Sequence, residues 1–355
     1  MPTFASDTLH ALAHAVCAAS GSVEREADLV ADQLVEANLT GHDSHGVGML
    51  PHYVSGLAKG ALVPNRHAEV ARDRGAVLVV EGNRGYGQVI GHEAMQLGMG
   101  RAQEQGVALL AVRNSFHLGR VGHWAEQCAR GGFASIHFVN GVDHPPLQAP
   151  FGGSDARLST NPFCAALPGD NGAAVVLDFA TTVIAMGKAR VAHNKAVPAP
   201  DGSLLDAEGR PTRDAGVMFR EPRGALIGMG LHKGAGLAIL CELLAGALTG
   251  GRTAQPEHPQ MGGTINNMLS VIIDPDAFGE RGALRREIEA LIAWVKASPP
   301  REGFEEILVP GEPERRRRAA LLASGLDVDP TSWAEILEAA RAAGVSQDEL
   351  DALVG

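Results

Sequence analysis

Residues 76–91 have the sequence AVLVVEGNRGYGQVIG, a compact apolar run followed by a glycine-rich turn. The valine-rich run predicts a β-strand, and residues 92–105 have the pattern of a helix. A strand, a glycine-rich turn and a helix also open a Rossmann dinucleotide-binding unit. Here, however, Gly85 and Gly87 are followed by Gly91, one residue too late for GxGxxG, and no acidic residue ends a following strand. The stretch therefore predicts a central sheet without the standard Rossmann winding.

The elements on either side of this stretch define the expected fold class. Further strands are predicted at residues 107–112, 134–139, 163–167, 174–179 and 269–273. Helices are predicted at 121–129, 181–191 and 234–248 in the centre, and at 8–39, 50–59 and from 281 onward at the two ends. Consecutive strands separated by irregular loops favour α+β over a regular βαβ series. We predict a helical domain from residues 1–70 and 275–355 and an α+β domain from residues 71–274, in which residues 198–223 form a long loop.

Composition and charge narrow the classes of function. The net charge of −11 and the sequence pI near 5.7 disfavour nucleic-acid binding. No signal peptide is visible, and the most apolar stretch, residues 234–248, contains Glu242 and is too short for a membrane span. The cysteines lie among apolar neighbours without CxxC spacing, which is typical of free buried thiols and of a cytoplasmic protein. They are Cys17, Cys128, Cys164 and Cys241.

The first candidate site is Asp43-Ser44-His45-Gly46, on the loop expected after the second helix. Histidine changes its protonation near neutral pH, so His45 suits proton transfer to or from a substrate oxygen. Ser44 can orient a hydroxyl or carbonyl group beside it. The alternative is an ordinary loop held by local Asp and Ser hydrogen bonds, with an incidental histidine.

Three further clusters lie where strands end or helices begin. Residues 114–120 follow a predicted strand and contain His117 and Arg120, a residue that can hold a carboxylate or phosphate. Asp178 precedes a predicted helix start and can accept a hydrogen bond from a ribose hydroxyl. The backbone amides at the start of that helix can bind a phosphate. Lys233 opens an apolar helix, where it suits an anion. Each cluster also fits a plain structural role as a packed histidine, a helix cap or a solvated lysine.

We expect no metal site, because the sequence has no HExxH motif and no paired cysteines near its histidines. A metal-dependent hydrolase or lyase using His42, His45 and His117 is the rival hypothesis from another class. A non-catalytic binding protein is a second rival.

Considered together, the clusters resemble the malate/L-lactate dehydrogenase family of the second type, which is unrelated to the Rossmann dehydrogenases. The resemblance covers nearly the whole chain, and within the family it is greatest to the hydroxycarboxylate dehydrogenase B branch. The matching segments occur in the family's order. They are residues 41–47, 114–119, 149–153, 160–162, 178–182 with 187–188, and 232–234.

The resemblance implies a fold, a reaction and an assembly. The fold has a helical domain built from both chain ends and a cofactor domain with a mixed, largely antiparallel sheet. The reaction is hydride transfer between NAD, with NADP left open, and a 2-hydroxy or 2-oxo carboxylic acid. Aryl pyruvates such as hydroxyphenylpyruvate are the expected substrates, and malate, lactate or ureidoglycolate are the alternatives. The assembly is a homodimer.

The resemblance also assigns roles to residues. His45 is the acid/base and Ser44 assists it, although in some relatives the histidine matching His117 is the proton acceptor. Many family members have an arginine where this chain has Met49, so we infer that Arg120 holds the substrate carboxylate or that the pocket accepts more apolar acids. NAD is expected to contact His45, Gly119, Arg120, Val121, Asp178, Phe179, Ala180, Lys233, Asn266, Pro310, Gly311 and Glu312.

Overall fold

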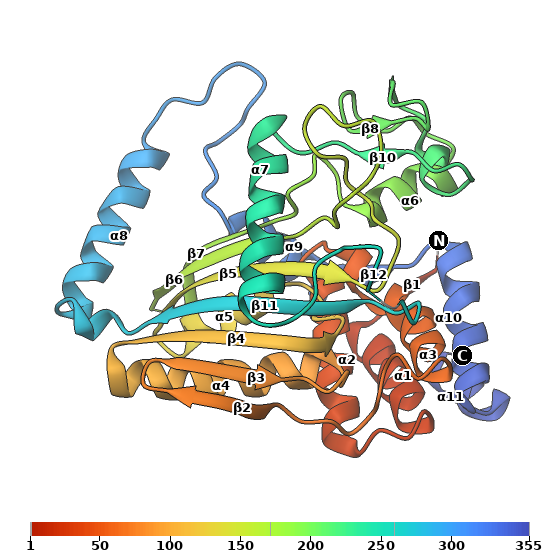
Figure 1. Ribbon diagram of the computed structural model, residues 1–355, viewed down its shortest axis with the longest axis horizontal. Coiled ribbons are helices and arrows are strands. Elements are labelled where there is room, and N and C mark those ends of the chain that lie inside the picture. The colour runs from red at the N-terminus through yellow and green to blue at the C-terminus, as the bar shows by residue number, and fades with distance from the viewer. Residues whose placement is uncertain (1, 171, 259, 355) are drawn as a thin grey trace.

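A seven-stranded sheet forms the centre of the molecule in the computed structural model, which describes residues 2–170, 172–258 and 260–354 (Figure 1). The strand order is β2-β3-β4-β11-β5-β6-β7, with β3 and β4 parallel and the other neighbouring pairs antiparallel. The prediction of a non-Rossmann α+β fold is confirmed. The strand predicted at 76–80 is observed one residue later, as β3, and the other five predicted strands lie within observed ones. The strands are β2 (Glu69–Arg74), β3 (Val77–Glu81), β4 (Val107–Phe116), β5 (Ala134–Val142), β6 (Phe163–Gly169), β7 (Gly172–Phe179) and β11 (Ile265–Ile273).

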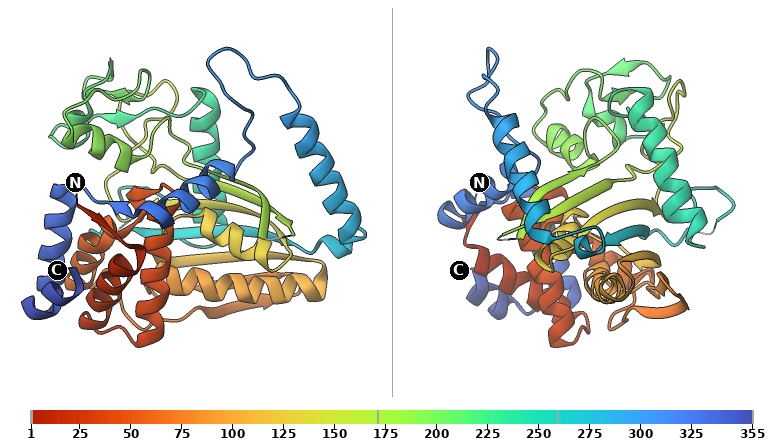
Figure 2. Two further views of the ribbon diagram at one scale, coloured as in Figure 1. Left: turned by 180° about the vertical axis from the view of Figure 1, so that it is seen from behind. Right: turned by 90° about the vertical axis from the view of Figure 1, so that its left-hand side faces the viewer.

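The two faces of this sheet carry different side chains, because successive residues of a strand point to opposite faces. Val139 and Met268 belong to the apolar core shared with α4 (Gly87–Gln105) and α5 (Gly122–Arg130). Their neighbours Asn140 and Asn267 instead face the helix that crosses the other side. That helix is α7 (His232–Cys241), continued by the π-helix η4 (Glu242–Leu248). Figure 2 shows the sheet between these two helical layers.

Both ends of the chain contribute to one helical group beside the sheet (Figure 1). Its core includes Leu12, Leu34, Tyr53, Ile336 and Leu350. The group consists of α1 (Ser6–Ala19), α2 (Glu24–Leu39), α3 (Leu50–Ala58), α10 (Pro330–Ala343) and α11 (Gln347–Val354), with β1 (Thr3–Phe4) paired to β12 (Leu326–Asp327) and α9 (Glu312–Ser324) against α2. In contrast, α8 (Arg281–Lys296) extends at the far end of the sheet (Figure 2). The domain division at residues 70 and 275 stays a prediction.

The segment predicted as a long loop, residues 198–223, is partly ordered into a small layer above the sheet. There β8 (Leu204–Leu205) lies between β9 (Pro211–Thr212) and β10 (Ala225–Leu226), near η3 (Ala215–Met218) and α6 (Met186–Asn194). The layer has its own apolar cluster, which includes Ala189, Leu204 and Leu226. That buried surface stabilises strands that the Pro-, Gly- and Asp-rich composition concealed.

Three predicted helices differ from the observed ones. The helix expected at 92–105 already begins at Gly87, inside the predicted glycine-rich turn. The helix expected at 181–191 begins only at Met186, because the backbone before it pairs with other segments: the Thr181 amide donates to Thr160 O (2.9 Å) and the Val183 amide donates to Ile227 O (2.9 Å). The helix expected at 234–248 starts at His232 and widens into the π-helix at Glu242. No described helix is both long and apolar enough to cross a membrane.

Candidate active site

The Asp43-Ser44-His45 segment is a 3-10 helix, η1 (Asp43–His45), that follows α2 and precedes η2 (Val47–Met49). Asn38, in the last turn of α2, holds it from both sides. Asn38 Nδ2 donates to Asp43 Oδ1 (2.8 Å), and Asn38 Oδ1 accepts from the Val47 amide (2.9 Å). A Cβ atom on Gly46 would lie 2.1 Å from Asn38 Oδ1, so only glycine fits there. The sequence analysis missed Asn38, although a buried asparagine in a helix's last turn is a recognisable signal of such anchoring.

The two histidines that were predicted to compete for proton transfer lie side by side. The ring centroids of His45 and His117 are 5.5 Å apart with an interplanar angle of 16°. Ser44 Oγ lies 2.9 Å from His45 Nδ1. A Cβ on Gly187 would lie 2.1 Å from Ser44 Cβ, so the first turn of α6 closes directly over this serine. The fold therefore brings three predicted catalytic residues into one centre.

Burial keeps both imidazoles neutral near pH 7. Burial and, to a smaller extent, the positive charge of Arg120 lower the pKa of His45 to about 4. Burial also lowers the pKa of His117 well below its ordinary value, with added repulsion from the positive charges that His45, His52 and His144 carry when protonated. A proton on one ring therefore disfavours a proton on the other, and the pair holds one proton at most in ordinary conditions.

A buried relay orients His117. Tyr53 Oη lies 3.0 Å from His117 Nδ1, and Gln88 Nε2 donates to Tyr53 Oη at 2.7 Å. Tyr53 and Gln88 are each 1% exposed. Since Gln88 donates to the tyrosine oxygen, the tyrosine hydroxyl proton can be donated to Nδ1 of His117, and this arrangement favours one tautomer. The neutral imidazole then carries its proton on Nε2. Sequence analysis did not find this relay, because its members come from α3 and α4.

Arg120 lies in a buried polar group beside His45. It is 2% exposed, and its Nη2 donates to Glu126 Oε2 at 2.5 Å, while its buried Nε has no partner among the described residues. Asp178 Oδ2 accepts from the Gly122 amide (2.8 Å), and a Cβ on Gly122 would lie 2.6 Å from both that oxygen and Arg120 Nη1. Burial raises the pKa of Asp178 to about 6, opposed by Arg120. The predicted substrate role of Arg120 stays a prediction, and one of its nitrogens already serves Glu126.

The residues predicted to contact a dinucleotide approach this centre from several elements. The Leu118 amide donates to Asn266 Oδ1 (2.9 Å), and Gly119 has φ +70° with a Cβ position 2.1 Å from Gln33 Oε1. The Val176 amide donates to Pro310 O (3.1 Å), which places Gly311 beside β7, the strand that ends in Asp178 and Phe179. Ala180 follows that strand, Val121 precedes α5, and Glu312 accepts from Lys296 Nζ at 2.6 Å.

Asp178 differs from its predicted placement, whereas Lys233 lies where it was predicted. Asp178 was expected just before a helix start, but α6 begins at Met186, so no helix amides follow it directly. The reason is the hydrogen bonding of Thr181 described above. Lys233 lies exposed in the first turn of α7, as expected, and a Cβ on Gly234 would lie 2.4 Å from Thr181 O. Met49 packs against the helical core.

His144, at the end of β5, is a neighbour of the site that the sequence analysis did not single out. Its Nδ1 lies 2.8 Å from Pro145 O, and Ser159 Oγ lies 3.3 Å from its Nε2. Its positive charge, when present, lowers the pKa of His117 and His52. Among the described residues, the one cluster with metal-ligand spacing is His14, Glu24 and Asp28, and it contains none of His42, His45 and His117.

Comparison with known proteins assigns the family. The model of the malate/L-lactate dehydrogenase family matches residues 4–337. The chain belongs to this family. Hydroxycarboxylate dehydrogenase B of Escherichia coli strain K12 is 46% identical over 351 residues, which cover 98% of this chain and 96% of that protein. L-lactate dehydrogenase of Cupriavidus necator is 40% identical over 321 residues, covering 90% and 92%.

A solved structure from E. coli, described as a malate/lactate dehydrogenase, superimposes with a TM-score of 0.95 at 45% identity and covers 99% of this chain and 98% of the other. The resemblance inferred from the sequence is therefore confirmed, together with its hydroxycarboxylate dehydrogenase B branch. The family identifies the chain as an oxidoreductase acting on small hydroxy or oxo acids.

Proposed function

We propose that the chain transfers hydride between NAD(H) and a 2-hydroxy or 2-oxo carboxylic acid, with aryl pyruvates such as hydroxyphenylpyruvate as substrates. The observation that carries the proposal is the Ser44–His45 pair facing His117 beside Arg120 and Asp178. The name of the E. coli relative, hydroxycarboxylate dehydrogenase B, supports this substrate class. Malate, lactate or ureidoglycolate are the alternative substrates, and the C. necator relative is an L-lactate dehydrogenase.

The surroundings of the histidines fit a nicotinamide cofactor. Arg120 Nε and His123 Nδ1 are buried and have no partner among the described residues, so they can meet polar ligand atoms. The residues that would hold the cofactor are His45, Gly119, Arg120, Val121, Asp178, Phe179, Ala180, Lys233, Asn266, Pro310, Gly311 and Glu312. When bound, the nicotinamide ring supplies or accepts the hydride.

The protein then provides proton transfer and positioning. In reduction of a 2-oxo acid, His45, which is neutral at rest, would take up a proton as the negatively charged substrate binds and would donate it to the carbonyl oxygen, while Ser44 bonds to its Nδ1 and keeps the ring in place. His117 shares this role through its Nε2, which Tyr53 and Gln88 leave as the outward nitrogen. The cation of Arg120 favours the substrate carboxylate next to the acid. In the opposite direction neutral His45 accepts the hydroxyl proton.

Loss of NADH or NADPH absorbance with a panel of 2-oxo acids tests this proposal. We expect phenylpyruvate and hydroxyphenylpyruvate to be reduced with NADH in the presence of EDTA. Reduction of no 2-oxo acid with either cofactor would contradict the proposal. Activity that disappears in EDTA would instead support the metal-dependent alternative.

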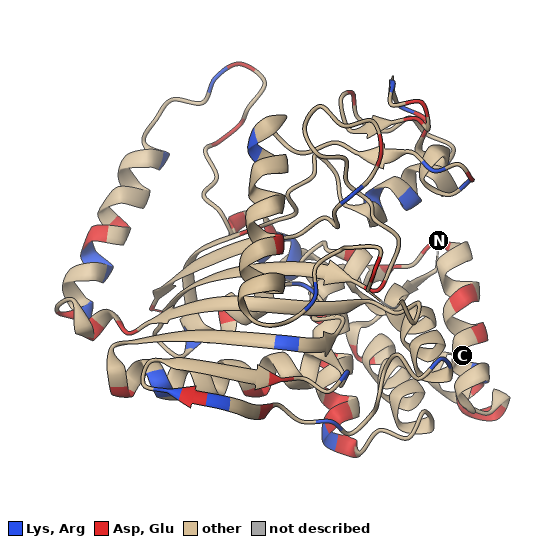
Figure 3. Ribbon diagram, viewed as in Figure 1, with Lys and Arg blue, Asp and Glu red and all other residues tan. Residues whose placement is uncertain are grey.

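We also propose that the enzyme is a cytoplasmic homodimer. The outward face of α7 and η4 carries Ile239, Leu240, Leu243 and Leu248, which are 45–65% exposed. Figure 3 shows no charge along this helix between Lys233 and Glu242. An exposed apolar stripe of this kind favours association with a second copy. Sedimentation should give a dimer for the wild type and a shift toward monomer for Leu243→Glu; a wild-type monomer would contradict the assignment.

A further inference from the structure

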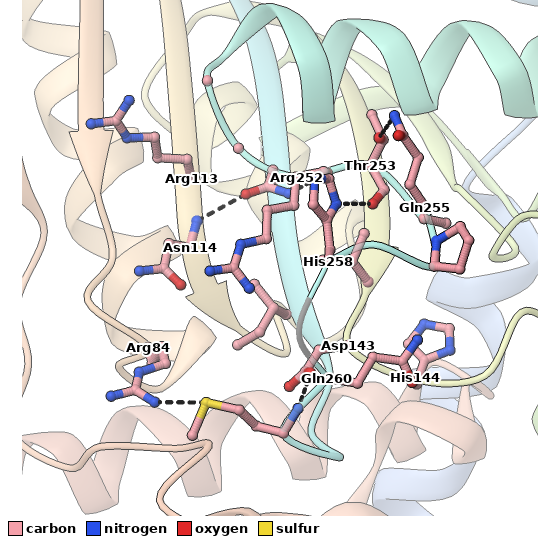
Figure 4. Close-up of a pocket in the computed structure, with 18 of the residues that line it drawn as sticks. Arg84, Arg113, Asn114, Asp143, His144, Arg252, Thr253, Gln255, His258 and Gln260 are labelled. Carbon is pink, nitrogen blue, oxygen red and sulfur yellow. Dashed lines mark hydrogen bonds between the residues drawn. The ribbon is translucent and has the colours of Figure 1, made fainter.

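A polar cavity separate from the histidine centre lies at the ends of β3, β4, β5 and β11, and we call it the arginine cavity (Figure 4). Its volume is about 500 Å³, which suits a small organic ligand. Asn114 lines it, whereas Ser44, His45 and His117 do not. The end of β4 and the residues directly after it therefore serve two separate places, with Asn114 on the cavity and His117 at the proton-transfer centre.

Three arginines from three segments line the arginine cavity. Arg113 lies on β4, Arg84 follows β3, and Arg252 follows η4 (Figure 4). Guanidinium groups gathered from separate segments are the usual means by which proteins hold carboxylate or phosphate groups.

The two carboxylates that line the same cavity are already engaged. Glu81 accepts from Arg113 Nε (2.9 Å) and from Asn114 Nδ2 (2.8 Å). Asp143 accepts from the amides of Met261 and Gly263. Three cations thus face two anions whose oxygens have hydrogen-bond donors, so the lining retains a positive balance for an incoming anion.

Unusual backbone conformations mark the same lining. Arg84, Asn114 and Asp143 have φ values of 58°, 54° and 70°, in the left-handed region that non-glycine residues seldom adopt. Such residues persist where the surrounding contacts over-determine them, and they gather at ligand sites. Asn114 is held in this way by Asn267 Oδ1, which accepts from its amide at 2.9 Å.

We propose that the arginine cavity binds a small organic polyanion carrying two or more carboxylate or phosphate groups, at a site separate from the reacting acid. The inference does not depend on the proposed reaction, because none of the proton-transfer residues lines the cavity. His144 lines it too, and its charge acts on His117. An anion bound in the cavity therefore lies next to His144, whose charge influences the pKa of His117.

Isothermal titration of the full chain with citrate and with pyrophosphate, at matched ionic strength, tests the site. We expect one ion of at least one type to bind per chain, and the preferred type identifies carboxylate or phosphate chemistry. Arg252→Gln and Arg113→Gln should each weaken binding by about tenfold, because each removes one charge-assisted contact. Arg72→Gln, an exposed change on β2 outside the cavity, is the matched control and should leave the Kd unchanged.

Three results would overturn the proposal. One is the absence of binding heat for both anions, and another is a Kd that neither cavity variant changes. The third is that a saturating 2-oxo acid competes with the anion while Arg252→Gln leaves the Kd of the anion unchanged. This result would place the anion at the histidines. Thermal unfolding of each variant checks folding; Arg252, which is exposed, serves as the decisive position if Arg113→Gln disturbs its pair with Glu81.

Discussion

The histidine centre and the arginine cavity are neighbours at the end of β4, yet they differ in the charge of their side chains and in their exposure to solvent. His117 is buried and His45 is half-buried, both rings are neutral, and buried partners hold the site: Asn38 holds the segment that carries His45, and Tyr53 holds His117. Around Arg113 and Arg252 the groups stay charged in a cavity open to solvent. Desolvation at the histidine centre disfavours the protonated imidazole, so a proton held there is readily passed to the substrate. In the solvated arginine cavity, permanent positive charges can attract an anion.

Removing His45 should have the largest effect. His45→Ala should lower kcat by roughly 10²–10⁴-fold with NADH binding partly retained, because general acid–base catalysis contributes about that much. Stopped-flow reduction of a 2-oxo acid measures it. His67→Ala is the control, since His67 is exposed and its imidazole pairs with Glu93 rather than with a residue of the centre. Near-normal activity of His45→Ala would move the role to His117.

Replacing Arg120 should have the next largest effect. Arg120→Met should raise KM for a 2-oxo acid by on the order of tenfold to a hundredfold, if one charge-assisted contact of about 1.5–3 kcal/mol is lost. Because Glu126 would then lack its partner, the double variant Arg120→Met/Glu126→Gln separates folding from binding. An unchanged KM in a folded variant would remove Arg120 from substrate binding.

Breaking the relay behind His117 should have a smaller effect. Tyr53→Phe removes the donor to Nδ1, so we expect kcat to fall by about tenfold or less and its pH profile to move, with KM little changed. Gln88→Glu should shift the same profile, whereas a purely structural role would lower stability and leave the profile in place. An unaltered profile in both variants contradicts the assigned positioning role.

The buried histidines should also make stability depend on pH. Their pKa values are lowered, to about 4 for His45 and about 3 for His123, from an ordinary 6.5, so the unfolded chain binds more protons below that pH. Stability should therefore decrease as pH falls from 6.5 toward 4.

Asp178 acts in the opposite sense, because its raised pKa of about 6 adds stability below that pH, but it is one group against several histidines. We expect Tm to be several degrees lower at about pH 5 than at about pH 7. His137→Asn should reduce the slope, because burial lowers the pKa of His137 to about 3. A Tm that does not change would contradict these shifts.

The alternation of strands and helices, the absence of a Rossmann fingerprint and the family could all be predicted from the sequence alone. These are local: the apolar pattern of residues 107–112 or 269–273 needs only its own neighbours to predict a strand. The Asp43–Gly46 segment, weak when considered alone, became a candidate site through five other segments in the same order.

The contacts among the site residues, in contrast, could be found only in the folded chain. The stacking of His45 on His117, the relay from Gln88 through Tyr53, and the pairing of Arg120 with Glu126 depend on helices and strands far apart in sequence. The late start of α6 depends likewise on backbone hydrogen bonds to Thr160 and Ile227. Proton affinity in particular is set by desolvation and nearby charge, and both are properties of the folded surroundings rather than of the residue type.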